Sequence, residues 1–365
     1  AQVALLVVAA AMLFANINYP LLSPDESRYG EIPREMIASD NWVRPQLNYE
    51  TYYDKPALLY WLGAISFKLF GVSNWSARLI APLSGFLTIA ATMWFGTRMF
   101  GRLTGLIAGA VLLVSVGFLG VSRMLLIDGL LTLLTTIAMF AAYEAIRGPG
   151  LKKSWWAVAT LATAVGFMAK GPIALVLLGP PVVAFAWLTA GAAQPKIRHW
   201  AIMGAAIVAL ATPWFLAVSQ QVPDFAYQFF YQHNVKRFGG AYHAQPVWYF
   251  LPVLMIAGHP WTFLTLPVLS YLGTRQNSAR ERRSPSLGYL ALWAGWCLAF
   301  FSASKCKLPT YILPAAPALA LLAAHYIRHG LTNVQHVAWR EYSRRWAPWA
   351  LALAAPSFPS LPVLA

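Results

Sequence analysis

Three isolated acidic residues lie next to long apolar segments of the sequence. Asp25 follows the first segment in PDESRYGEIPREM, Asp54 precedes another in YYDKP, and Asp128 begins a third in RMLLID. Pro24 before Asp25 is typical of a helix start, where a carboxylate meets the positive end of the helix dipole. An ionisable group at the edge of a bilayer is costly and is usually functional. We therefore interpret Asp25 as a functional residue rather than only a cap.

Basic and aromatic residues accompany these acids at the ends of apolar segments. They are Arg28, Lys55, Lys170, Arg237, Lys305 and Lys307, with His233 in HNVKRF and Tyr311 in SKCKLPTY. Cations at a lipid boundary suit a lipid-linked phosphate or pyrophosphate, because charge-assisted hydrogen bonds hold such a group. Carboxylates beside them suit an oxocarbenium-like centre, an amino sugar or a metal ion. The residues alone leave these alternatives open.

The elements that must position these residues follow from composition. The 365-residue chain is 59% hydrophobic and only 11% charged, with a mean hydropathy of +0.55. So little polar surface cannot coat a soluble globule of this size. In lipid every backbone amide needs an internal partner, so only helices or closed barrels span a membrane. The apolar runs are continuous and lack the alternation of barrel strands. We predict an all-α membrane protein, a polytopic helical bundle.

The apolar runs predict about eleven spans. They are residues 3–22, 78–97, 103–121, 125–146, 155–169, 172–190, 200–219, 248–272, 286–303, 311–327 and 346–364. Two intervening loops, 23–57 and 220–247, are long enough to hold structure, and the first is expected to continue as an interfacial helix through Phe70. Its tyrosines, among them Tyr52, suit either an aromatic belt at the interface or sugar stacking.

The net charge of +15 follows the loops rather than a basic domain. With the N-terminus placed in the cytoplasm, more than half of the 27 Lys and Arg residues fall on that side, but only Glu144, Glu281 and Glu341 of the 12 acids do. This asymmetry is the positive-inside rule. It argues against nucleic-acid binding, which needs a soluble basic surface. The three isolated acids then share the non-cytoplasmic face.

Taken in order, several strings of the sequence resemble a known family. DESRYGEIPREMIASDNWVRPQLN, YYDKPALLYW, GVSNWSARL, MLLID, AKGP, HNVKRF and SKCKLPTYIL are similar to the aminoarabinose transferases that modify lipid A. They are also similar to the wider polyprenyl-phosphate-dependent glycosyltransferases of the GT-C type, which include the protein O-mannosyltransferases. The resemblance runs over nearly the whole chain. It implies a bacterial inner-membrane enzyme with a periplasmic active site and a sugar donor carried on undecaprenyl phosphate.

The resemblance also implies a domain organisation. We expect residues 1–365 to form the transmembrane catalytic domain, with short interfacial helices in the periplasmic loops. The family carries a C-terminal periplasmic domain, which we expect to lie outside this sequence.

The resemblance assigns roles to individual positions. The catalytic acids it implies are Asp25, Asp128 and Asp54, with Asp25 positioning or deprotonating the acceptor. The residues it places at the carrier phosphate are Arg28, Lys55 and Tyr311, and Lys305 and Lys307 are added because they are cations beside Tyr311. A divalent metal is a possible cofactor, shared by Asp54 and His233. Asp54 departs from the Glu that these transferases usually have, and its side chain is one methylene shorter.

The expected reaction moves a sugar, 4-amino-4-deoxy-L-arabinose first among the candidates, from undecaprenyl phosphate to a lipid A phosphate. Galacturonic acid or a hexose remains an alternative donor, and a protein or another glycan or lipid an alternative acceptor. An acceptor phosphate is already ionised and needs only steering by Asp25, whereas a hydroxyl needs a general base.

The loop 220–247 is a candidate lid over the site. The rival classes are a lipid-linked glycan polymerase or ligase and a non-enzymatic transporter, which would bury charges within its spans.

Overall fold

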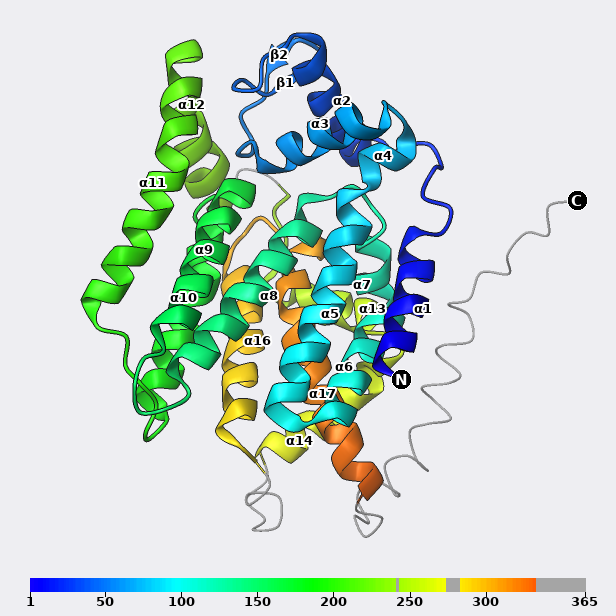
Figure 1. Cartoon of the computed structure of the whole chain (residues 1–365), viewed down its shortest axis with the longest axis vertical. Helices are drawn as coiled ribbons and strands as arrows, with labels where there is room; N and C mark the ends of the chain where they lie inside the picture. The colour runs from blue at the N-terminus through cyan, green and yellow to red at the C-terminus, as the bar shows by residue number, and fades with distance from the viewer. Residues whose placement is uncertain (241–242, 274–282, 333–365) are drawn as a thin grey trace, which may run out of the picture.

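The computed structural model describes residues 1–240, 243–273 and 283–332. Figure 1 shows most helices side by side along the long axis, with a smaller group of elements gathered at one end. We call this group, residues 25–78, the cap. It comprises α2 (Asp25–Ala38), β1 (Gln46–Leu47), β2 (Glu50–Thr51), α3 (Leu58–Phe70) and α4 (Asn74–Arg78). The two strands form an antiparallel hairpin.

The rest of the described chain forms the bundle. Its helices are α1 (Gln2–Phe14), α5 (Ile80–Phe100), α6 (Arg102–Val114), α7 (Val116–Val121), α8 (Ile127–Ile146), α9 (Lys153–Lys170), α10 (Ile173–Leu188), α11 (Ile197–Gln221), α13 (Phe250–Ala257), α14 (Thr265–Gly273), α16 (Pro285–Ala303) and α17 (Ala316–Thr332). Shorter turns are α12 (Phe225–Tyr227), η1 (Gln228–Lys236), η2 (Val247–Tyr249), η3 (Trp261–Leu264) and η4 (Pro309–Ala315).

Membrane-spanning potential is concentrated in a few of these helices. Among the described residues, five helical stretches are long and apolar enough to cross a bilayer: Asn74–Phe100, Ile127–Ile146, Ile197–Gln221, Pro285–Ala303 and Pro309–Arg328. Four further apolar helices are shorter, among them α1 and α6. The count of eleven spans stays a prediction, and the last expected span, 346–364, lies outside the described residues.

Helix α8 lies at the centre of the bundle and packs on α5, α9 and α10. The hydroxyls of Thr132 and Thr136 donate to backbone carbonyls four residues earlier, at 2.7 and 2.6 Å. Phe140 stacks on Phe95 of α5 with ring centroids 4.5 Å apart and meets Trp293 of α16 edge-on at 5.3 Å. Close packing of this kind holds membrane helices together, because lipid offers no hydrophobic driving force between them.

Two predicted spans are broken in the structure. The segment 248–272 is two helices, Val247–Ala257 and Trp261–Gly273, that meet at 116°. The segment 103–121 is interrupted at Ser115, between α6 and α7. The breaks lie together, because the amide of Val116 donates to the carbonyl of His259 at 3.0 Å. Pro260 lacks the backbone N–H that would continue the preceding helix. The hydrogen bond between Val116 and His259 satisfies backbone groups that the two breaks leave without helical partners.

The predicted loop 23–57 is largely ordered structure. Helix α2 begins at Asp25, as the Pro24–Asp25 pair indicates, and α3 ends at Phe70, as expected. A buried ion pair lies within the cap: Arg78 Nη2 lies 2.8 Å from Glu26 Oε2, and both side chains are fully buried. Glu26 also accepts a hydrogen bond from the amide of Leu125 at 2.7 Å, which joins the cap to the turn before α8. The other predicted loop, 220–247, holds α12 and η1, with residues 241–242 outside the described chain.

Candidate active site

The cluster around Asp54 lies between the cap and η1. Its carboxylate contacts His233 Nδ1 at 2.5 Å and Arg237 Nη1 at 3.6 Å, and it accepts a hydrogen bond from the Tyr52 hydroxyl at 3.1 Å. Burial alone would raise the pKa of Asp54, but the bond from His233 and the charges of Lys55 and Arg237 hold it below its usual range. Asp54 is therefore an anion that fixes three neighbours in place.

Lys55 follows directly and is buried. Its ammonium donates to the backbone carbonyl of Asp54 at 2.9 Å, rather than to a carboxylate. Burial, helped by the charges of Arg237 and Lys170, lowers the pKa of Lys55 to about 7, although Asp54 and Asp128 oppose that shift. Lys55 therefore lies within reach of the charges of both the Asp54 cluster and the Asp128 cluster.

Asp128 is held where three helix ends meet. It lies in the first turn of α8, and its carboxylate contacts Lys170 Nζ at 2.5 Å and accepts from the Thr310 hydroxyl at 2.8 Å. Lys170 is the last residue of α9, and its ammonium lies 4.4 Å from the centroid of the Tyr311 ring. An acid at a helix start and a cation at a helix end both suit the helix dipoles. The helix dipoles therefore favour both charges of the pair, which lies beside the Tyr311 ring.

Asp25 and Arg28 connect the cap surface to this centre. Arg28 donates to the Tyr52 hydroxyl at 3.3 Å and lies 3.9 Å from Asp25. The Asp25 side chain is 57% exposed. A chain of polar contacts thus runs from Asp25 through Arg28 and Tyr52 to Asp54. Six of the predicted site residues, with His233, lie along this chain or beside Asp128: Asp25, Arg28, Asp54, Lys55, Asp128 and Tyr311.

Lys305 and Lys307 are placed differently. Lys307 is 2% exposed, and its ammonium donates to the backbone carbonyls of Gln245, at 3.0 Å, and Ser304. Lys305 is exposed, and its backbone pairs with Phe238 and Gln245. Both lysines therefore fasten the 304–308 turn to the segment around residue 245, and their role at a phosphate stays a prediction.

Lys170 and Arg237 are among the cations that the sequence places near the acids, but neither the residue pattern nor the resemblance assigns them a role. Lys170 and Arg237 contact Asp128 and Asp54 directly. Their position in the sequence could have indicated this role, because both are expected at the same membrane edge as the acids they pair with. The Tyr52 hydroxyl accepts from Arg28 and donates to Asp54. Neither an aromatic belt nor sugar stacking, the two roles expected for Tyr52, predicts this link.

The site provides few donors for a metal ion. Within the part of the chain that the structure describes, no group of three or more His, Cys, Asp or Glu residues could hold a metal. Asp54 and His233 supply two donors and contact each other directly, whereas protein zinc sites use three or four. These residues do not by themselves form a complete metal site, and the metal stays a prediction.

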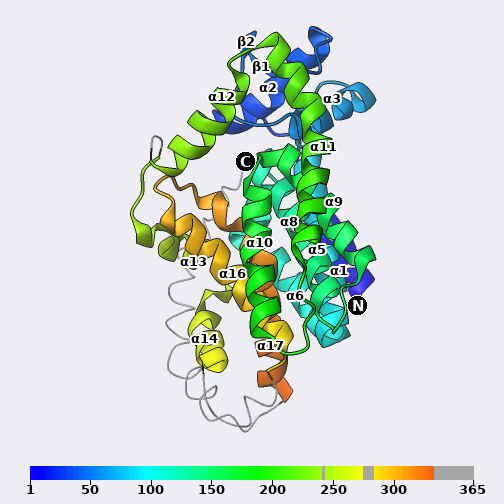
Figure 2. The same cartoon turned by 90° about the vertical axis from the view of Figure 1, so that its left-hand side faces the viewer.

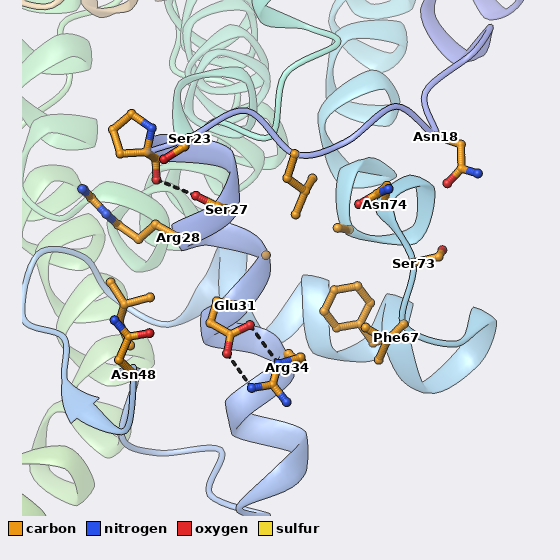
Figure 3. A pocket seen from close by; sticks show the side chains of 16 residues that line it. Asn18, Ser23, Ser27, Arg28, Glu31, Arg34, Asn48, Phe67, Ser73 and Asn74 are labelled. Atoms are coloured by element: carbon orange, nitrogen blue, oxygen red, sulfur yellow. Dashed lines mark hydrogen bonds and ion pairs between the residues drawn. The ribbon is translucent and has the colours of Figure 1, made fainter.

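A polar groove opens on the other side of Arg28. Figure 3 shows this groove, which has a volume of about 730 Å³ and lies between α2, α3, α4 and the hairpin. Arg34 is held in it by Glu31 through bonds of 2.8 and 2.5 Å. Arg28 lies at the rim, so it faces both the groove and the contacts to Asp54.

Two solved membrane glycosyltransferases share the fold of this chain. The chain aligns with the crystal structure of ArnT from Cupriavidus metallidurans bound to undecaprenyl phosphate with a TM-score of 0.81 and 27% identity, covering 99% of this chain and 66% of that one. It aligns with the archaeal oligosaccharyltransferase AglB of Archaeoglobus fulgidus at a TM-score of 0.62 and 14% identity, covering 97% and 54%, a likeness of fold alone. The predicted all-α membrane fold of the GT-C type is confirmed, and the chain is a multi-pass membrane protein.

Sequence relatives agree with the structural ones. The chain is 34% identical over 344 residues to an undecaprenyl phosphate-alpha-4-amino-4-deoxy-L-arabinose arabinosyl transferase of Yersinia pestis, covering 92% of this chain and 60% of that protein. The Yersinia enterocolitica protein of the same name is 35% identical over 334 residues, covering 88% and 58%. The chain thus spans about three fifths of the length of these relatives. Residues 3–229 match the family model described as dolichyl-phosphate-mannose-protein mannosyltransferase, and the chain belongs to that family.

Proposed function

We propose that this protein transfers a sugar from undecaprenyl phosphate to an acceptor at the cap end of the bundle, on the periplasmic face of the bacterial inner membrane. The proposed donor sugar is 4-amino-4-deoxy-L-arabinose and the proposed acceptor is a lipid A phosphate. The names of the relatives and the undecaprenyl phosphate in the ArnT structure support this assignment. The observation that carries it is the grouping of Lys55, Lys170 and Arg237 around two carboxylates at one end of the bundle.

These cations suit the departing group. As an acceptor oxygen bonds to the anomeric carbon, the bond from that carbon to the carrier phosphate breaks, and the phosphate keeps the electron pair. The charge that develops on it needs donors already in place. Lys170 and Arg237 are each oriented by a carboxylate, while the ammonium of Lys55 contacts a backbone carbonyl and keeps donors for a phosphate. Lys55 is therefore the proposed main phosphate ligand.

Asp25 is proposed to act on the acceptor. It is the most exposed acid of the site, stands at the start of α2, and is paired loosely with Arg28. If the acceptor is a phosphate, Asp25 steers it or contacts the amino group of the sugar, while Arg28 stays with the carrier phosphate. If the acceptor is a hydroxyl, Asp25 takes its proton.

The rival classes make different use of the same geometry. A transporter is expected to carry ionisable groups or broken helices at the middle of the membrane. The two broken spans of this chain have no acid at their breaks, at Ser115 and residues 258–260. The site acids lie instead on the cap or in the first turn of α8, which favours chemistry at one face. A glycan polymerase or ligase would share the carrier site and differ only in acceptor, so the acceptor decides between them.

Mass spectrometry of lipid A tests the proposal. Cells that carry the full-length gene, lack it, or express Asp25→Asn are compared, with Asp40→Asn as the matched control. Asp40 is an exposed acid of the same cap, and its φ of 51° suits Asn. We expect a sugar-sized mass that is lost on deletion and on Asp25→Asn but kept by Asp40→Asn. Lipid A that is unchanged by deletion would rule out this acceptor and direct the search to protein or other glycan acceptors.

A further inference from the structure

A second groove lies between α9 and α11, towards the end of the bundle opposite the cap. Its volume is about 810 Å³, and it follows the N-terminal halves of both helices, from Lys153 to Ala164 and from Arg198 to Leu210. The C-terminal ends of the same helices lie towards the cap, where Lys170 ends α9 beside Asp128 (Figure 1). This groove is therefore separate from the candidate active site.

The walls of the groove are apolar and exposed along their length. Leu161 of α9 is 63% exposed, and Ile202 and Leu210 of α11 are 60% and 43% exposed. At a rise of 1.5 Å per residue, the stretch from Lys153 to Ala164 is about 17 Å long. That is close to half of the roughly 30 Å hydrocarbon core of a bilayer. The groove has the length of one leaflet.

Positively charged residues lie at the end of the groove that is farthest from the cap. Lys153 is the first residue of α9 and Arg198 lies in the first turn of α11, with Lys196 as the residue before that helix. The positive ends of both helix dipoles add to this charge. Trp156 closes the floor there, since its indole N–H donates to the carbonyl of His199 at 3.3 Å and ties the helices together.

These cations differ from others at the same end of the bundle. Arg98 and Arg147 both lie 3.1 Å from the fully buried Glu144, so the fold uses their charge. Among the ion pairs of residues 1–240, 243–273 and 283–332, none involves Lys153 or Arg198. The positive-inside rule accounts for cations on this side but not for an apolar groove that begins between two of them.

We propose that this groove binds one anionic glycerophospholipid of the leaflet opposite the candidate active site. Lys153 and Arg198 hold the headgroup phosphate, and one acyl chain lies along α9 and α11. Arg198 Nε donates to His199 Nε2 at 3.4 Å, but neither Arg198 nor Lys153 forms an ion pair with a described carboxylate. Two such cations favour a headgroup with net negative charge over a zwitterionic one, because no acid lines the groove to pair with a headgroup amine. The proposal is independent of the proposed function, since none of these residues belongs to the candidate active site.

Native mass spectrometry of the full-length protein in detergent tests the proposal. Phosphatidylglycerol is titrated against phosphatidylethanolamine with the same acyl chains. We expect wild type to bind phosphatidylglycerol at least tenfold more tightly, and the double variant Lys153→Gln, Arg198→Gln to lose that preference. Arg102→Gln, which removes an exposed cation at the same end on α6, is the matched control and keeps it.

A further variant tests the apolar part of the groove without changing its charge. Ala157 is exposed and lines the groove, so Ala157→Phe fills the space for the acyl chain. We expect this variant to bind both lipids at least tenfold more weakly. Equal affinity of wild type for the two lipids, a preference kept by the double variant, or full binding by Ala157→Phe would each overturn the proposal.

Discussion

Asp25 and Glu26 are neighbours in sequence on α2, yet the fold treats them in opposite ways. Glu26 is fully buried and accepts two bonds from Arg78 at 2.8 Å, one from the amide of Leu22 and one from the amide of Leu125. Asp25 is more than half exposed, and its nearest cation, Arg28, is 3.9 Å away. One carboxylate has every acceptor occupied, while the other is left open to a ligand.

The buried carboxylate supports the open one. Burial raises the pKa of Glu26, but the bonds from Arg78 and the two amides outweigh this and lower it. Arg78 also donates to the carbonyls of Ile17, at 2.9 Å, and Pro20, at 2.7 Å. The pair therefore fixes the start of α2, the segment after α1, and the turn at Leu125 that leads to Asp128. Fully satisfied charges build this scaffold, and partly satisfied charges form the site upon it.

The largest effect is expected from breaking the scaffold pair. Arg78→Met leaves the buried Glu26 without its partner, and the loss of one partner from a buried pair costs about 3–5 kcal/mol. Thermal unfolding of the purified protein should show a strongly destabilised variant. Adding Glu26→Gln removes the stranded charge, so the double variant should be more stable than Arg78→Met alone. A double variant that is no more stable would contradict the pairing.

Asp25→Asn should lower activity while leaving thermal stability unchanged. The side chain is exposed and of unchanged size, so we expect the midpoint of thermal unfolding to stay within about 2 °C of wild type. The rate of sugar transfer should fall by about 10²–10⁴-fold if Asp25 takes a proton from the acceptor, and less if it only steers a phosphate. Full activity of Asp25→Asn would assign the residue to a helix cap. Asp40→Asn serves as the control in the same assay.

Part of this comparison could be predicted from the sequence and part could not. The start of α2 at Asp25 follows from local chemistry. The resemblance, which has Asp54 and His233 share a metal, indicates that they lie near each other, but their direct contact comes from the structure. The Glu26–Arg78 pair joins residues 52 positions apart, and nothing in either local sequence marks the partner. Hydropathy located the apolar segment 248–272, but it carries no information on the direction of the helix axis. It therefore did not predict the 116° bend, although Pro260 in the sequence is a residue at which a helix can break.

A smaller effect should separate two buried lysines. Lys307 donates to backbone carbonyls, whereas Lys55 lies among the site charges. Lys307→Met leaves those buried carbonyls short of a donor, which costs about 1–3 kcal/mol. We expect lower thermal stability with unchanged affinity for undecaprenyl phosphate. Weaker binding at unchanged stability would instead place Lys307 at the phosphate.

A further predicted effect is a pH dependence of carrier binding. Because burial lowers the pKa of Lys55 to about 7, its ammonium loses its proton as the pH rises through that value. The carrier phosphate should therefore bind more weakly between pH 7 and 9, by up to about tenfold per unit. Lys55→Arg stays charged over this range, so its binding curve should be nearly flat. A wild-type curve as flat as that of the variant would exclude Lys55 as the titrating group.

The most direct test of the account is the affinity of the purified full-length protein for undecaprenyl phosphate in wild type, Lys55→Met and Lys305→Met. Lys55 is buried within the charge cluster, whereas Lys305 is exposed and pairs through its backbone. The account predicts that Lys55→Met binds at least tenfold more weakly while Lys305→Met binds within about twofold of wild type. Equal affinities of wild type and Lys55→Met would contradict the claim that this cluster holds the carrier phosphate.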